Sequence, residues 1–308
     1  MEVEYLRTLR ELRDRGSVTA VAKARHLSPS AVSQQLAALQ RTVNVPLTRQ
    51  SGRVLVLTDT GERLADASEA VFASLSIARD SVDHYLQAMN QIVTVTAFHS
   101  AGLAWFPPLI GYSLSHPGGP QVHCRDEDVA VEEFVPLVAD YNVVIAHRPL
   151  DSAPWPKQRV HISPILTEPI DLALSRDHPL AQHPTVKLED IAHETWIAAH
   201  EGFALEPLLL QAMATTAGGA ITIAHRVNEF NVAAAIIATT HIVGLLPRYT
   251  GLPPQFRDRV VLRPIEHLTI ARHIDALSRP DVYARASVKS TIASIRQIAK
   301  RAVGQNEG

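Results

Sequence analysis

The sequence predicts an α/β protein in which a small helical head is followed by one long helix and a two-lobed body. Three observations support this class. Short amphipathic helix patterns fill the first 57 residues, and a proline-free segment with apolar residues at heptad spacing follows them. Beyond residue 91, strand-like and helix-like segments alternate, which is typical of α/β domains. The predicted boundaries are 1–58 for the head, 59–90 for the linking helix and 91–308 for the body.

The composition is that of a globular protein that can bury a sizeable core, with 46% hydrophobic and 19% charged residues. The one cysteine, Cys124, excludes a disulfide scaffold and a thiolate metal cluster, and it fits a reducing compartment. The N-terminal segment lacks the apolar run of a signal peptide, and the uncharged apolar stretch at 231–247 is short for a bilayer span. These features predict a cytoplasmic protein with no membrane partner.

The head begins with two predicted helices. Gly16 follows the basic last turn of the first helix, as a C-terminal stop does. Ser17 or Thr19 can cap a second, short helix that ends near Arg25, and a short turn at 26–28 follows. The apolar stripe of the first helix consists of Tyr5, Leu6, Leu9 and Leu12.

A third helix is predicted from Ser28 to about Val43. Ser28 is a good N-cap, and Pro29 occupies the first helical position, where its missing N–H costs nothing. The sides away from the apolar stripe carry small polar residues and amides, which permit close approach to a major groove and can bond base edges or phosphates. A merely solvated polar face is the alternative. The apolar stripe consists of Val32, Leu36, Leu39 and Val43.

Residues 47–49 and 54–57 predict a small hairpin, with Arg49 and Arg53 at its tip, where they can reach phosphate or the minor groove. Residues 1–57 hold nine Lys and Arg and four acids (9 − 4 = +5), whereas residues 91–308 hold 18 basic and 21 acidic residues (18 − 21 = −3). This asymmetry favours a nucleic-acid partner at one end of the chain, although chance can produce the same sum. The residues expected to contact DNA are Ser28, Ser30, Ser33, Gln34, Gln35, Arg49 and Arg53.

The head resembles that of a known family. The residues at 16–22, 27–39, 46–49, 52–53 and 57–61 together are similar to the DNA-binding head of LysR-type transcriptional regulators. The resemblance implies a winged helix-turn-helix that binds double-stranded promoter DNA. Thr48 stands where the family usually has Phe, which removes an aromatic group from the packing of the wing. The other departures are Arg25, Gln40 and Asn44.

The linking helix starts with Asp59 and Glu62, which offer a capping-box-like beginning. About 30 helical residues form a rod of roughly 45 Å, and such a rod needs a partner for its apolar seam. Pairing through this helix would present two heads to two half-sites, so we expect a homodimer or a tetramer. The alternative is a helix that lies on its own body. The seam consists of Leu64, Val71, Leu75, Ala78, Val82, Tyr85 and Met89.

The body is predicted to contain a first lobe of about 91–162 and 267–308 and a second lobe of about 163–266. In the first lobe we expect strands at 92–98, 121–125, 143–146 and 268–277 and helices at 102–115, 129–139 and 282–301, the last packing Val288, Ile292, Ile295 and Ile298. Alternating strands and helices imply a parallel sheet. After a crossing near 160–165, the second lobe is expected to contain strands at 169–175, 196–199, 222–226 and 242–246 and helices at 203–216 and 231–240.

Residues 178–181, 186–190 and 244–247 resemble the effector domain of the same family, which is similar to periplasmic binding proteins. Ligands of open α/β sheets bind off the carboxyl ends of strands. The resemblance implies that the loops at these ends face one another between the lobes, so a small-molecule effector, a carboxylate or an amino acid, is expected there. Ser100 could bind an anion, Arg148 could pair with a carboxylate, and an aromatic ring could cover an apolar part. The residues expected to contact the effector are His99, Ser100, Ala101, His147, Arg148, His200, Phe203, Phe230 and Asn231.

Two other classes compete with a regulator. An enzyme is disfavoured because the sequence has no Gly-rich phosphate loop, nucleophile elbow or metal-ligand spacing, so no cofactor and no metal are expected. A thiol redox sensor needs a resolving partner, and Cys124 has none within the chain. RNA polymerase is a further partner that a regulator can contact. An acidic cluster either forms a solvated face or selects a cationic ligand; it consists of Asp126, Glu127, Asp128, Glu132 and Glu133.

Overall fold

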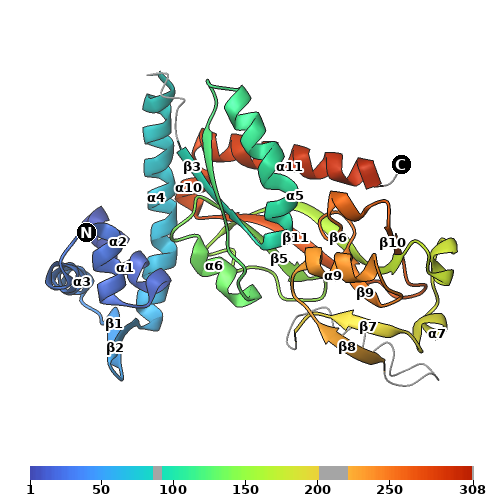
Figure 1. Ribbon diagram of the computed structural model, residues 1–308. Coiled ribbons are helices and arrows are strands. Elements are labelled where there is room, and N and C mark those ends of the chain that lie inside the picture. Colours follow the sequence, from blue (N-terminus) through green and yellow to red (C-terminus); the bar gives the residue numbers. More distant parts are fainter. Residues whose placement is uncertain (86–91, 201–220, 307–308) are drawn as a thin grey trace.

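The computed structural model describes residues 1–85, 92–200 and 221–306. A small head contains α1 to α3 and the hairpin β1–β2, the long helix α4 stands beside it, and the α/β body lies on the other side of α4 (Figure 1). The predicted class, an α/β chain with a winged helical head and a two-lobed body, is confirmed. Within the described residues, no helix is both long enough and apolar enough to cross a membrane.

The head folds as its local signals predict. Its elements are α1 (Val3–Arg15), α2 (Val18–Arg25), α3 (Pro29–Val43), β1 (Thr48–Ser51) and β2 (Val54–Leu57). Gly16 ends α1 at a φ of 67°, in the left-handed region that favours glycine. Ser17 and Ser28 cap α2 and α3, because their hydroxyl oxygens accept hydrogen bonds at 3.1 Å from the amides of Ala20 and Ala31.

Helix α4 (Asp59–Tyr85) connects the head to the body. Its N-cap is Thr58 and not Asp59, since the Thr58 hydroxyl accepts from the Gly61 amide at 3.1 Å and Asp59 is already helical. Phe72 on one side of α4 is buried in the core of the head. The predicted seam faces away from the chain's own core: Val71 is 40%, Leu75 38% and Val82 56% exposed, and Ala78 is exposed as well.

Three of the predicted seam residues are not part of this exposed surface as described. Leu64 packs against the core of the head, so the exposed part of the seam begins at Val71. Tyr85 ends the described part of α4, and Met89 lies outside the described residues.

The first lobe contains a sheet of five strands in the order β4-β3-β5-β11-β6. They are β3 (Ile92–Ala97), β4 (Gln121–Asp126), β5 (Val143–Pro149), β6 (His161–Ser175) and β11 (Ala271–Ser278). The predicted parallel pairing holds for β3 with β4 and β5, but β11 runs antiparallel to both of its neighbours. β11 is antiparallel because the chain enters this strand from the second lobe and so runs through the first-lobe sheet in the opposite direction.

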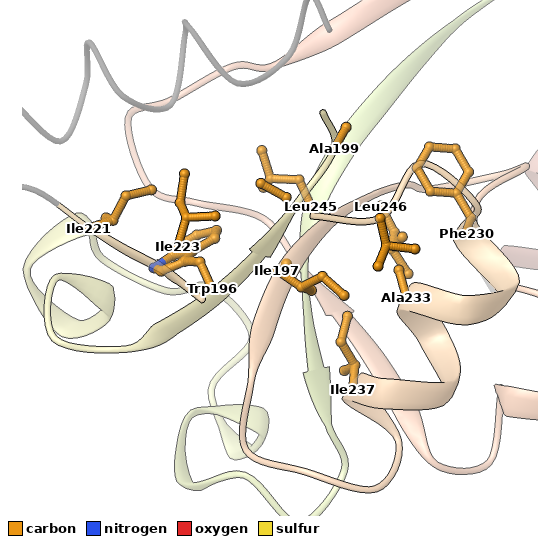
Figure 2. A pocket seen from close by; sticks show the side chains of 13 residues that line it. Trp196, Ile197, Ala199, Ile221, Ile223, Phe230, Ala233, Ile237, Leu245 and Leu246 are labelled. Atoms are coloured by element: carbon orange, nitrogen blue, oxygen red, sulfur yellow. The ribbon is translucent and has the colours of Figure 1, made fainter. Parts of the chain in front are cut away.

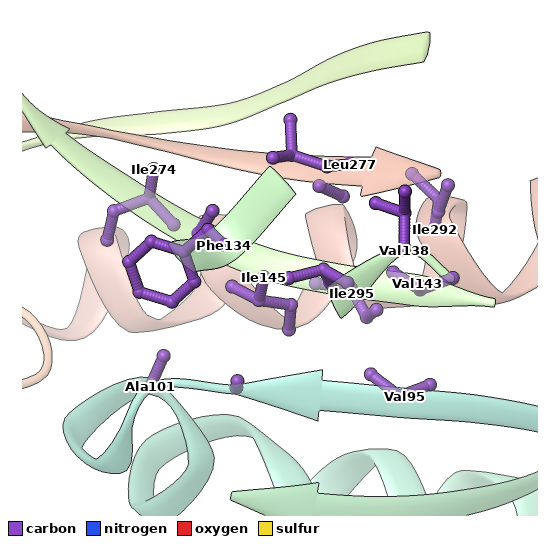
Figure 3. Packing of buried hydrophobic residues seen from close by; sticks show 14 of the residues in the cluster. Val95, Ala101, Phe134, Val138, Val143, Ile145, Ile274, Leu277, Ile292 and Ile295 are labelled. Carbon is purple, nitrogen blue, oxygen red and sulfur yellow. The ribbon is translucent and has the colours of Figure 1, made fainter. Parts of the chain in front are cut away.

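The helices of this lobe are α5 (His99–Ser115), α6 (Phe134–Leu137), α10 (Pro280–Tyr283) and α11 (Ala286–Asn306), with a 3-10 turn, η1 (Val131–Glu133). The predicted helix at 129–139 is wrong, since only η1 and one turn of α6 form there. Pro136 supplies no amide hydrogen bond and its ring disfavours a preceding helical turn. Side chains of β3, β5 and β11 gather with Phe134 and with Ile292 and Ile295 of α11 in a buried core (Figure 3).

The second lobe contains β7 (Thr195–Ala198), β8 (Thr222–Arg226), β9 (Val243–Pro247) and β10 (Val260–Arg263). Its described helices are α7 (Leu188–Ile191) and α9 (Phe230–Ile237), with 3-10 turns η2 (Pro179–Gln182) and η3 (Pro254–Phe256). The sequence did not indicate β10, a short strand that pairs with β6. The helix predicted at 203–216 lies outside the described residues.

One strand joins the two lobes. The segments predicted at 160–165 and 169–175 are the single strand β6, of 15 residues. Up to Pro169 it pairs with β11, and from Ile170 it pairs with β9 and β10. Residues 163–169 therefore extend the sheet of the first lobe, and the change of partners falls later in the chain than the predicted boundary at 163.

Candidate functional sites

The exposed side of α3 carries the polar residues that the sequence indicated. Ser28, Ser30, Ser33 and Gln34 are exposed, whereas the apolar stripe on the opposite side is buried in the head. The Ser33 hydroxyl donates to the carbonyl of Pro29 at 3.0 Å, and no described residue bonds the Gln34 side chain. This side of α3 is therefore free to meet another molecule.

Gln35 lies elsewhere. It is half-buried, and its side-chain oxygen accepts a hydrogen bond from the Thr8 hydroxyl of α1. Arg25 lies beside this pair and donates to the carbonyl of Glu4 at 3.0 Å. Gln35 thus ties α3 to α1 through its side-chain oxygen, and its predicted contact with DNA stays a prediction.

The basic residues of the head divide into two groups. Arg10, Arg13 and Arg15 point toward α4 and the body, where they form ion pairs. Arg7 and Arg25 pair with Glu4. The others are exposed and form no ion pair within the described residues; they are Lys23, Arg41, Arg49 and Arg53. These four residues therefore supply the positive charge at the surface near α3 and the hairpin, and the other arginines counted in the net charge of residues 1–57 do not.

A buried ion-pair cluster joins the head to the body. It contains Arg10, Glu11, Arg13 and Asp14 of α1, Glu69 of α4, and Arg279 and Asp281 of the body. We call it the junction cluster. Arg279 pairs with Glu11 and with Asp14, each at 2.7 Å. Arg10 pairs with Asp281 at 3.1 Å and with Glu69 at 3.3 Å.

The junction cluster shifts the titration of its members. Burial alone would raise the pKa of Glu11, but the guanidinium groups of Arg279 and Arg15 lower it to about 2. Burial raises the pKa of Glu69 above its usual range despite the adjacent Arg10 and Arg13. Because charged groups this deeply buried are costly unless paired, the cluster holds the head and the body in a defined arrangement.

A cavity of about 100 Å³ lies between the lobes. It begins at the N-terminal turn of α5, whose N-cap, Phe98, provides no side-chain hydrogen bond. The lining contains Phe98, His99, Ser100, Asp128, His147, Asn228, Glu229, Phe230 and Arg272. Four of these were predicted as effector contacts: His99, Ser100, His147 and Phe230.

Arg272 lies at the centre of the polar network beside this cavity. Its Nε donates to Glu168 at 2.9 Å, and its Nη2 donates to the hydroxyls of Thr250 at 2.9 Å and Ser100 at 3.1 Å. Glu168 is directly opposite Arg272 in the β6–β11 register, and Thr250 follows β9. The network therefore joins α5 of the first lobe, both central strands and the second lobe.

Sequence reasoning missed Glu168, Thr250 and Arg272. The rule for parallel sheets places ligands at the carboxyl ends of strands, and neither Glu168 nor Arg272 lies at such an end. Arg272 stands near the beginning of β11, and β11 runs antiparallel to β5. The first residues of β11 therefore lie at the same edge of the sheet as the last residues of β5 and β3. The antiparallel direction of β11, which the sequence did not indicate, is what places Arg272 at this edge.

The histidines of the cavity differ in environment. Burial, together with the positive charge of Arg272, lowers the pKa of His147 to about 3. The centroid of its ring lies 4.7 Å from that of the Phe98 ring, in an edge-to-face contact. His99 is half-exposed, with Nδ1 3.3 Å from Asp126 of the first lobe and Nε2 3.3 Å from Glu229 of the second lobe. His147 is thus a neutral part of the wall, whereas His99 bridges the lobes.

The remaining predicted effector residues do not line this cavity. Ala101 is buried in the core, and Arg148 donates to the Ser152 carbonyl and approaches Asp275. His200 is exposed, and its backbone amide binds Asn228. The Asn231 side chain donates to Glu229. Phe203 lies outside the described residues.

A second cavity, of about 60 Å³, lies within the second lobe between its strands and α9 (Figure 2). Its described lining is apolar apart from the Trp196 indole, whose Nε1 has no hydrogen-bond partner among the residues that the structure describes. Phe230 lines both cavities.

Two chemical groups bear on the alternative functions. Burial raises the pKa of the Cys124 thiol to about 11, so the reactive thiolate is scarce at neutral pH. Among the described residues, no three His, Cys, Asp or Glu side chains are grouped as a metal site requires. The environment of Cys124 therefore disfavours the redox-sensor alternative.

Comparison with known proteins agrees with these two parts. The family model of the bacterial regulatory helix-turn-helix protein, lysR family, matches residues 3–62, and that of the LysR substrate binding domain matches residues 87–300. The HTH-type transcriptional regulator MetR of Escherichia coli is 28% identical over 195 residues, which are 63% of this chain and 59% of that protein. The matched part of this chain thus spans less than two thirds of the length of that MetR protein.

Solved structures share the fold. A full-length OxyR variant from Pseudomonas aeruginosa has a TM-score of 0.63 at 17% identity, covering 97% of this chain and 95% of that one. Full-length LysG from Corynebacterium glutamicum with bound effector Arg has a TM-score of 0.61 at 18% identity, covering 98% and 99%.

Proposed function

The chain belongs to the family of LysR-type transcriptional regulators, and we propose that it binds promoter DNA as a homo-oligomer and alters transcription when a small molecule occupies the cavity between its lobes. The observation that carries this proposal is the pairing of an exposed polar α3 with four exposed cations on the same small head. A regulator of promoter DNA acts in the cytoplasm.

The head supports docking of α3 in the major groove. The N-terminal turns of α3 present Ser30, Ser33 and Gln34, which can bond base edges, while Arg49 and Arg53 on the hairpin are placed for phosphate or the minor groove. The buried arginines of the head hold it on α4 and on the body, and make no contact with DNA in this proposal.

Self-association rests on α4. The exposed seam of Val71, Leu75, Ala78 and Val82 leaves an apolar surface that a second copy of α4 would cover. Exposed apolar side chains on α5, including Leu103 and Leu114, offer a second surface. A dimer through α4 places two heads for two half-sites, and use of both surfaces would build a tetramer.

The effector response rests on the crossing strands. β6 and β11 pair side by side; Arg272 of β11 lines the cavity, and Glu168 of β6 accepts a hydrogen bond from Arg272 behind that wall. A ligand that binds one arrangement of the lobes better than another would shift the position of the head through β11 and the junction cluster. Contact with RNA polymerase is a further part of this proposal where the regulator activates transcription.

The direct test is binding of the full chain to the DNA upstream of its own coding region and its neighbouring genes. We expect a protein-dependent mobility shift with a footprint of two related half-sites, while a DNA fragment of scrambled sequence binds much more weakly. A purified chain that binds no upstream fragment at low salt would contradict the proposal.

A further inference from the structure

The polar groups that line the cavity between the lobes are separated by burial: the donors Arg272 and Ser100 are buried, at what we call the inner end, whereas the carboxylates of Asp128 and Glu229 are more exposed, at what we call the mouth. From this separation we infer that the effector is an α-amino acid or a closely similar zwitterion, with its carboxylate at Arg272 and its ammonium group at Asp128 and Glu229. The inference rests on the proposed function, because it names the ligand class of that cavity.

The inner end offers donors. Arg272 is 4% exposed and lines the cavity, and its Nη1 donates no hydrogen bond to a described residue. The first turn of α5, a helix of 17 residues, ends at the cavity without a side-chain cap, so its amides at His99 to Ala101 are available. Donors on two different elements thus converge on one place for an anionic group.

The buried carboxylate behind Arg272 does not oppose an anion there. Glu168 is 0% exposed, and its oxygens accept hydrogen bonds from the amides of Tyr249 and Thr250, the Thr250 hydroxyl and Arg272. It therefore fixes the guanidinium and does not line the cavity. His147 on the same wall is neutral and makes no hydrogen bond with a described residue, so it can donate to an anion as well.

The mouth has the opposite character. Asp128 and Glu229 line it from the two lobes, and among the described residues no Lys or Arg other than Arg272 is part of the lining. His99 lies between Asp126 and Glu229 at 3.3 Å from each. Carboxylates of both lobes therefore lie around one nitrogen-bearing side chain in the cleft. A ligand ammonium near Asp128 and Glu229 would use the same environment.

This arrangement discriminates among ligand classes. A dicarboxylate would place its second anion beside Asp128 and Glu229, and a diamine would place a cation beside the Arg272 guanidinium. Each is opposed by like charge at one end. A zwitterion is matched at both ends.

The test is a thermal-shift and calorimetric titration of the full chain with the proteinogenic L-amino acids. For each amino acid that binds, two truncated probes are added: the carboxylic acid without the amino group and the primary amine without the carboxylate. We expect at least one amino acid to bind, and both of its truncated probes to bind about tenfold or more weakly, since each loses a charge-assisted hydrogen bond.

Variants locate the ammonium group. Glu229→Gln keeps an oxygen that can cap α9 but removes the charge, and it should weaken the amino acid about tenfold while leaving the carboxylic acid probe unchanged. Asp128→Asn should act in the same direction. Glu132→Gln is the matched control, because Glu132 is exposed on the same acidic segment and outside the cavity lining, so it should change neither affinity.

The inference is overturned if no amino acid binds, if a truncated probe binds as tightly as its parent, or if Glu229→Gln leaves the amino acid affinity unchanged. The same preparations are assayed for upstream DNA. DNA binding without amino acid binding overturns this inference alone, whereas amino acid binding without DNA binding overturns the proposed function.

Discussion

Arg272 and Arg279 stand at the two ends of one strand, and each anchors a different functional part of the chain. Arg272, near the beginning of β11, lies in the wall of the cavity between the lobes. Arg279, directly after the last residue of β11, pairs with Glu11 and Asp14 of the head. A single extended element therefore connects the ligand cavity to the DNA-binding head.

Arg279→Gln should weaken this connection. It removes one of the two close arginine partners of each buried carboxylate, Glu11 and Asp14, so we expect a loss of about 3 kcal/mol in the free energy of unfolding and a reduced effect of ligand on DNA affinity. Chemical denaturation measures the first, and DNA titration with and without ligand measures the second. Lys300→Gln, an exposed change on α11, is the control and should alter neither. An unchanged stability of Arg279→Gln would show that the junction cluster does not hold the head.

Glu11 should make stability depend on pH. Its pKa in the folded chain is about 2, below its ordinary value of 4.5, so the folded state favours the carboxylate. The stabilisation is present above about pH 4.5 and is lost as the pH falls toward 2. Urea unfolding of the wild type and of Glu11→Gln should give a difference that shrinks as the pH is lowered from about 6 to about 3.5. A difference that is constant with pH contradicts the assignment.

His147 should stay neutral throughout the physiological range. Its pKa of about 3 lies below the ordinary 6.5, so the unfolded chain binds the proton more readily and stability falls as the pH drops from about 6.5 toward 3. Nuclear magnetic resonance of the His147 ring should show no titration between about pH 5 and 8. A midpoint for His147 near 6.5 would show that the ring is hydrated.

The α4 seam should control assembly. Asp at both Leu75 and Val82 buries charge in the proposed interface and should convert oligomers to monomers in light scattering, without loss of helix content. Ile77→Asp is the matched control, because Ile77 is 58% exposed on the same helix but off the heptad seam, and it should leave the oligomers intact. Oligomers that survive both seam substitutions would place the interface elsewhere.

Local signals in the sequence were sufficient for the head. The caps at Ser17 and Ser28 and the stop at Gly16 each depend on a few neighbouring residues, and all three form as expected. The capping of α4 was misplaced by one residue, because Thr58 and Asp59 are both good capping residues and only the helical geometry of Asp59 distinguishes them.

Tertiary pairing decided the features that the sequence did not predict. Glu168 and Arg272 look like solvent-facing charges in two distant strands, and only the β6–β11 register places them opposite each other in the core. The net charge of the head could not show that Arg10 and Arg13 are buried at the junction while Arg49 and Arg53 remain exposed. Sums of charge and strand periodicity carry no information on which partner a side chain meets.

The salt dependence of DNA binding tests the central claim most directly. Fluorescence anisotropy with labelled upstream DNA, from about 50 to about 200 mM KCl, should give a log affinity that falls linearly with log salt. Joint replacement of Arg49 and Arg53 by Ala should reduce that slope by about 2, while Lys300→Ala on the body should leave it unchanged. Wild-type binding that is absent or independent of salt, or a slope that persists without the two hairpin arginines, would contradict the proposed DNA-binding head.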